Sequence, residues 1–67
     1  MKLTRRQDEI ARLAATGLPN KLIARQLGIS EGTVKLHMHS VFARLGIRSR
    51  ALLAAQWRLG AAMIEKT

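Results

Sequence analysis

The sequence has no cysteine, few aromatic residues and few acids. Without cysteine the chain can form no disulfide, no thiolate nucleophile and no zinc finger. Phe42 and Trp57 are its only aromatic residues, so the core must be built from aliphatic side chains and methionine, as in small helices packed on each other. A length of 67 residues suffices for one domain, so we treat residues 1–67 as a single unit.

Long apolar runs are also missing. The longest, residues 51–55, is far below the roughly 20 residues that a membrane-spanning helix needs. The first residues lack the apolar stretch of a secretory signal, so we expect a cytoplasmic protein. The four acidic residues are scattered, and no nucleophile elbow or phosphate-binding loop surrounds them. We therefore expect no enzyme activity, no cofactor and no small-molecule substrate.

Positive charge is what the chain has in excess. Twelve Lys and Arg residues against four Asp and Glu give a formal net charge of +8, which predicts a polyanionic partner. Double-stranded DNA is one such partner. An anionic membrane bound by a basic amphipathic domain is the alternative.

Capping and glycine signals divide the first half of the chain into two helices. Thr4 and Gln7 match a capping box that begins the first helix, and Gly17 is placed to end it. The second helix is expected over residues 20–27, with Gly28 after it. The residues expected to face the core at helical spacing are Ile10, Leu13, Ala14, Ile23, Ala24 and Leu27.

The second half predicts two more helices and no strand. Ser30 can cap a third helix that Gly46 ends, and Ser49 can cap a fourth that runs at least to Leu59, with Gly60 as its candidate stop. An apolar stripe at helical spacing marks the core face of the third helix: Val34, His37, Met38, Val41, Phe42 and Leu45. The fold class predicted is therefore all-α, with four helices.

A helix-turn-helix is indicated over residues 20–45. Ala24, Gly28 and Val34 supply a small residue, a glycine and an apolar plug at the spacing that two steeply crossing helices need. An ordinary helical hairpin would satisfy the same pattern. The opposite face of the third helix favours DNA, because it has no acid and could enter a major groove: Gly32, Lys35, Leu36, His39, Ser40 and Ala43.

These segments together resemble a known family. The chain looks like the DNA-binding domain of LuxR-type regulators, particularly the NarL and FixJ response regulators of two-component systems. The segments that carry the resemblance are the capped first helix with residues 17–21, Leu27-Gly28-Ile29-Ser30-Glu31, Thr33-Val34-Lys35 and residues 45–50. The resemblance implies the output domain of a bacterial transcriptional regulator. It also implies the positions of DNA contacts: bases at Lys35, Leu36 and His39, and phosphates at or near Thr33, Arg48 and Arg44 or Arg50.

Several residues keep two interpretations. His39 is either a base reader or a solvated residue, and His37 and His39 point too far apart to share a metal ion, so no metal site is expected. Lys21 either reaches a phosphate with nearby backbone amides or is merely solvated. Ser40 completes the candidate DNA-contacting set. Trp57 is expected in the core rather than as a platform for unpaired bases.

The predicted fourth helix has two apolar faces, of which a three-helix core can cover one. Leu53 and Trp57 mark the face expected to be covered. Leu52, Ala55 and Leu59 lie nearly opposite, and we expect them to form the seam of a homodimer. The resemblance places pairing on this helix too. A docking contact with RNA polymerase is compatible with DNA binding.

Overall fold

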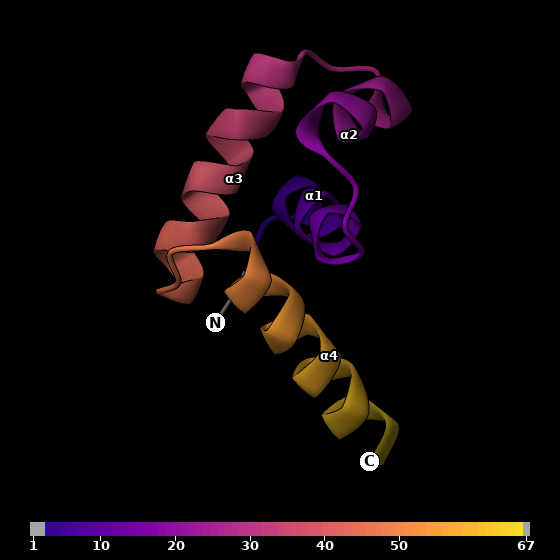
Figure 1. Ribbon diagram of the computed structural model, residues 1–67, viewed down its shortest axis with the longest axis vertical. Helices are drawn as coiled ribbons and strands as arrows, with labels where there is room; N and C mark the ends of the chain where they lie inside the picture. The colour runs from indigo at the N-terminus through magenta and orange to yellow at the C-terminus, as the bar shows by residue number, and fades with distance from the viewer. Residues whose placement is uncertain (1–2, 67) are drawn as a thin grey trace.

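The computed structural model describes the backbone of residues 3–66 and the side chains of residues 3–58. The described chain is entirely helical between its turns, and the predicted all-α fold is confirmed. Figure 1 shows its four helices: α1 (Arg5–Ala15), α2 (Asn20–Leu27), α3 (Glu31–Leu45) and α4 (Arg50–Lys66).

Polar side chains begin three of these helices as predicted. At α1, Gln7 N–H donates to Thr4 Oγ1 over 3.1 Å and Thr4 N–H donates to Gln7 Oε1 over 3.0 Å, which completes the capping box. Ser30 Oγ accepts from Thr33 N–H at the start of α3, over 3.0 Å. Leu52 N–H donates to Ser49 Oγ over 3.2 Å at the start of α4.

The fourth helix runs beyond Leu59, within the prediction of a helix that reaches at least that residue, and the candidate stop at Gly60 does not end it. α4 continues through Gly60 to Lys66 instead of stopping there. A glycine inside a helix costs only about 1 kcal/mol relative to alanine, and the flanking segment is rich in residues that favour helix. The local penalty is therefore too small to end the helix.

The core surrounds α1, which packs against each of the other three helices. Its apolar members come from all four helices: Ile10, Ala11, Ala14, Ile23, Ala24, Val34, Met38, Val41 and Leu53. Leu13 and Leu27, which were expected inside, lie half-buried at its edge. Trp57 also packs against the core, as predicted. The core therefore fixes α3 and α4 through a shared support, α1.

The turn between α2 and α3 has the predicted form. Gly28 takes the left-handed conformation, with φ +69°, and Ile29 N–H donates back to the Ala24 carbonyl over 3.0 Å. Ala24 and Val34 are buried on either side of the turn. A side chain at a left-handed position crowds the following carbonyl oxygen, so glycine is the residue that makes this turn without strain.

Two glycine substitutions test this account of the turn. Gly28→Ala should lower the free energy of unfolding by about 1–2 kcal/mol through backbone strain alone, because a Cβ there would meet nothing within 4 Å. Gly32→Ala, in helical backbone with only Ser30 Oγ near its Cβ at 3.9 Å, should raise it by up to about 1 kcal/mol. Chemical denaturation of both variants measures the difference. Equal effects of the two substitutions would contradict a backbone origin.

Candidate nucleic-acid interface

α3 divides into one buried face and one exposed face. Val34, Met38 and Val41 are buried, while His37, Phe42 and Leu45 are half-buried beside them. On the opposite side lies what we call the α3 outer face, residues 32, 35, 36, 39, 40 and 43, all exposed except the half-buried Ser40. The face predicted to meet DNA is therefore accessible to a large partner.

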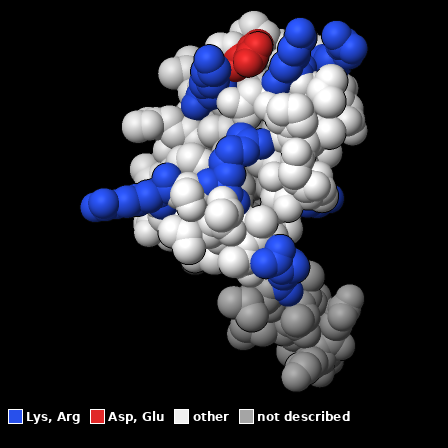
Figure 2. Space-filling view, in the orientation of Figure 1, with Lys and Arg blue, Asp and Glu red and all other residues white. Residues whose placement is uncertain are grey.

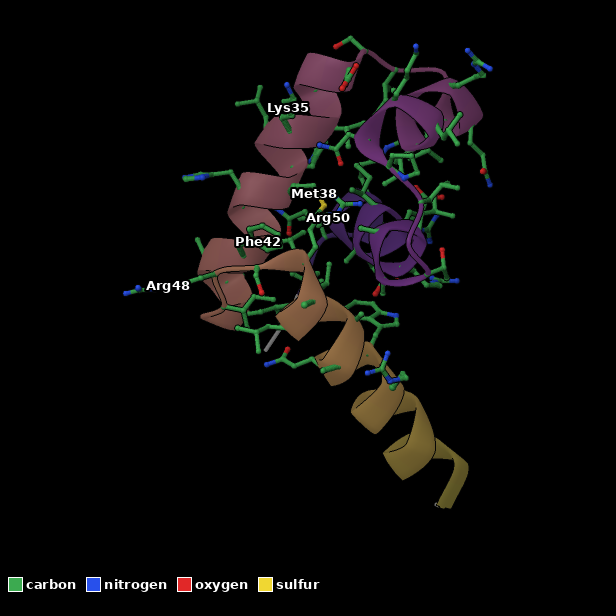
Figure 3. All side chains as sticks on the ribbon, viewed as in Figure 1. Lys35, Met38, Phe42, Arg48 and Arg50 are labelled. Atoms are coloured by element: carbon green, nitrogen blue, oxygen red, sulfur yellow. The ribbon has the colours of Figure 1, made fainter. Side chains whose placement is uncertain are left out.

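The composition of the α3 outer face is unusual for a solvated surface. Leu36 is 72% exposed and stands between Lys35 and His39, with no apolar cover. Met38 and Phe42 hold the other side of the same helix against the domain (Figure 3). A rigid helix thus presents a cation, a large apolar side chain and an imidazole to the outside. These groups can meet phosphates, thymine methyl groups and base edges.

Charge is distributed unevenly between the helices. On α1, Arg12 Nη2 pairs with Asp8 Oδ2 at 2.8 Å and Arg6 Nη1 with Glu9 Oε1 at 3.4 Å, so the acids there are matched by neighbouring arginines. Among the described residues, no acid pairs with Lys21, Lys35 or Arg48.

The pairing on α1 leaves excess positive charge elsewhere on the molecule. Figure 2 shows basic side chains spread over one face, with acid confined to a small area near its top. Basic side chains therefore cover more of this face than acidic ones do.

The candidate phosphate ligands come from α2, from α3 and from the connection to α4. Lys21 is exposed in the first turn of α2, and Arg48 is exposed in the connection to α4, where it extends away from the domain (Figure 3). Arg44 is exposed in the last turn of α3. Thr33 is half-buried, and its hydroxyl shares a 2.8 Å hydrogen bond with Ser30 Oγ. Exposed cations therefore stand on three segments outside the α3 outer face: the first turn of α2, the last turn of α3 and the connection to α4.

Arg50, the remaining candidate, is directed inward. Its Nη1 donates to Asn20 Oδ1 over 2.8 Å and its Nη2 donates to the Leu18 carbonyl over 2.6 Å. Sequence reasoning missed both partners. A signal was present: an arginine in the first turn of a helix opposes the helix dipole, and no acid lies three or four residues away to compensate.

The two faces of α4 differ as expected within the described side chains. Leu53 is fully buried, whereas its neighbour Leu52 is 50% exposed and Ala55 is half-buried. The side chain of Leu59, the third residue of the predicted seam, lies outside the described residues. None of the described helices combines the length and apolar character needed to cross a membrane.

A buried stripe on one helix, an exposed basic face opposite and a tight glycine turn to the preceding helix define a helix-turn-helix module for DNA. Residues 1–56 match the model of the luxR family of bacterial regulatory proteins. The chain belongs to this family. As a helix-turn-helix domain of the family, it is a DNA-binding module of transcription regulation, and the family is a regulatory class rather than an enzyme class.

Curated relatives agree with this assignment. The nitrate/nitrite response regulator NarL of Escherichia coli is 46% identical over 56 residues, which cover 84% of this chain and 26% of NarL. The monoamine regulon transcriptional regulator of Klebsiella aerogenes is 42% identical over 60 residues, 90% of this chain and 26% of its own length. The two-component response regulator PprB of Pseudomonas aeruginosa is 45% identical over 53 residues, 79% of this chain and 19% of PprB. The chain thus spans about a quarter of the first two relatives and about a fifth of PprB.

Proposed function

We propose that this domain binds specific sites in double-stranded DNA by placing the α3 outer face in the major groove. The observation that carries the proposal is the separation of the two sides of α3: Val34 and Val41 are fully buried, while Leu36 is 72% exposed beside Lys35 and His39. A major groove about 12 Å wide admits an α-helix, and its base edges offer acceptors and methyl groups to these side chains. Ser40, half-buried at the edge of this face, is at the margin of that contact.

Cations outside the α3 outer face would fix the domain on the backbone of the duplex. Lys21 lies before the turn, and Arg44 and Arg48 lie at and beyond the end of α3. Phosphate contacts of this kind set register and orientation, whereas base contacts choose the sequence. Thr33, near the start of α3, adds a hydroxyl to these candidate phosphate ligands. Arg50 contributes differently, because its guanidinium is bound within the domain.

The second part of the proposal is that two domains pair through α4 on neighbouring half-sites. Leu52 leaves half of its surface in solvent next to the fully buried Leu53, and Ala55 lies one turn further along. Leu59 would continue the seam. Two-fold pairing would place the two recognition helices about one helical turn of DNA apart. Because the relatives are several times longer, we infer that the domain is the output unit of a cytoplasmic response regulator.

An anionic membrane and RNA polymerase are the two other candidate partners. A membrane-bound domain would not require a buried Ala24 and Val34 around a left-handed glycine, so the geometry of the turn favours DNA. Docking of RNA polymerase stays a prediction that is compatible with DNA binding.

A charge placed in the seam tests the pairing. Leu52→Glu should leave affinity for a single half-site unchanged and abolish cooperativity on a duplex with two half-sites, because two like charges would face each other across the axis. Fluorescence anisotropy titrations of one-site and two-site duplexes measure both quantities. Circular dichroism should show unchanged helix content, since Leu52 is 50% exposed.

The matched control for this test is Leu52→Lys. Alone, it should lose cooperativity as the glutamate variant does, and an equal mixture of the two variants should recover it through pairing of opposite charges. Cooperativity that survives in folded Leu52→Glu would move the seam away from this face of α4.

A further inference from the structure

Arg50 connects two parts of the domain that are far apart in the sequence. It is the first residue of α4, yet its guanidinium reaches Leu18 and Asn20, which lie 32 and 30 residues earlier. Figure 3 shows Arg50 in the middle of the domain, between α4 and the other helices. Leu18 lies in the segment that leads into α2, and Asn20 is the first residue of α2. Arg50 therefore holds that segment from the first turn of α4.

The start of α2 packs against the core through Leu18 but has no side-chain cap. Its N-cap is Pro19, which gives no side-chain hydrogen bond, and its first turn has no acid. The other three helices each begin with a hydroxyl that accepts from a backbone N–H. α2 is also short, at 8 residues, so the placement of its first turn depends on tertiary contacts. The Arg50 hydrogen bonds supply such a contact.

The position of Arg50 is electrostatically unfavourable in isolation. A cation in the first turn of a helix faces the positive end of the helix dipole, and the two acceptors of Arg50 are neutral oxygens. Planar guanidinium can donate to two acceptors at fixed angles, which an ammonium group cannot do. The geometry of the fork, rather than pairing of charges, explains an arginine here.

We propose that Arg50 is a positioning residue for DNA binding, which acts by holding the start of α2 so that Lys21 meets the phosphate backbone. Lys21 follows Asn20 directly, and its side chain is exposed with no acid paired to it among the described residues. The inference rests on the proposed function of the domain. It gives Arg50 a role different from that of Arg48, whose exposed side chain extends away from the domain.

The test compares Lys21→Ala in two backgrounds. The probe is a duplex recovered by the wild-type domain from a random-sequence pool, titrated at several salt concentrations. In the wild-type background Lys21→Ala should reduce the log-log salt slope by about 0.9, the value for one lost phosphate contact. In the Arg50→Met background the same substitution should reduce the slope by less than half as much, because Lys21 is no longer held at the phosphate.

Arg48→Ala is the matched control, since it should reduce the slope by about 0.9 in both backgrounds. A general loss of stability would weaken both contacts alike, so selective loss of the Lys21 effect identifies positioning. Arg50→Lys keeps the charge but not the fork, and it should behave like Arg50→Met. Thermal unfolding followed by circular dichroism should show a fall in Tm of about 5 °C for Arg50→Met. Asn20→Ala should lower the Tm less in the Arg50→Met background than in the wild type, because the Arg50–Asn20 hydrogen bond is already lost there.

Three results would count against the positioning role of Arg50. Equal effects of Lys21→Ala in the two backgrounds would overturn the proposal. A second result would also overturn it: Arg50→Met leaves the Tm unchanged and lowers the salt slope by about 0.9, whether or not Lys21 is present. Arg50 would then be a direct phosphate ligand. A wild-type domain that recovers no duplex would overturn the proposed function and with it the DNA role of Arg50. The Tm comparison with Asn20→Ala would then still report whether the tether exists.

Discussion

Leu53→Ala should lower the free energy of unfolding by about 2–5 kcal/mol, the range for removing a buried leucine and leaving a cavity. Leu53 is fully buried and is the one residue of α4 among the buried core side chains of the described chain. A domain of 67 residues has roughly 3–10 kcal/mol of stability in total, at about 0.05–0.15 kcal/mol per residue. The variant should therefore be partly or wholly unfolded at 37 °C. Urea denaturation at lower temperature measures the loss.

Its neighbour provides the control. Leu52 has the same side chain in the same helical turn but is 50% exposed, so Leu52→Ala should change stability by less than about 1 kcal/mol. The contrast tests the assignment of the two faces of α4 separately from any role in pairing. Similar losses for the two variants would show that Leu52 also belongs to the core.

Lys35→Ala should reduce discrimination between the preferred site and random DNA by about 1–3 kcal/mol, or roughly 5- to 150-fold, if Lys35 holds a guanine edge. The lysine is exposed on the α3 outer face, where no acid pairs with it among the described residues. Its removal should leave the fold intact, because it covers none of the core. Competition titrations with specific and random duplexes measure the change.

Arg48→Ala distinguishes affinity from specificity in the same assay. Arg48 is exposed outside the helix, in the connection to α4, so its loss should weaken all duplexes about equally and reduce the salt slope by about one. If Lys35→Ala instead gives equal losses on specific and random DNA, Lys35 is a phosphate ligand and sequence choice lies elsewhere on α3.

Features that depend on neighbouring residues could be predicted from the sequence. The Thr4 and Gln7 capping box, the Ser30 cap and the helix end at Gly28 involve partners within a few positions, and all three form as predicted. The outer face of α3 was also predictable, because helical periodicity fixes which residues lie opposite a buried stripe. These local rules are sufficient to place Lys35, Leu36 and His39 on one accessible surface.

Features that depend on distant contacts could not be predicted in the same way. The sequence left open whether the fourth helix stops at Gly60 or continues, and it continues because the helical preference of the neighbouring residues outweighs one glycine. The acceptors of Arg50 lie 30 and 32 residues away, and no periodic pattern in the sequence pairs them. The sequence showed only that the charge of Arg50 lacked a local partner. Tertiary packing decides where such a side chain goes.

The most direct test of DNA reading by α3 is the ratio of affinities for a selected paired site and for random DNA. It should be measured for the wild-type domain and for a triple variant with alanine at Lys35, Leu36 and His39. The wild-type ratio should be about a thousandfold or more. The triple variant should stay folded and keep salt-dependent binding, while its ratio falls close to one. A folded triple variant that still discriminates as the wild type does would contradict the assignment of the α3 outer face as the reading surface.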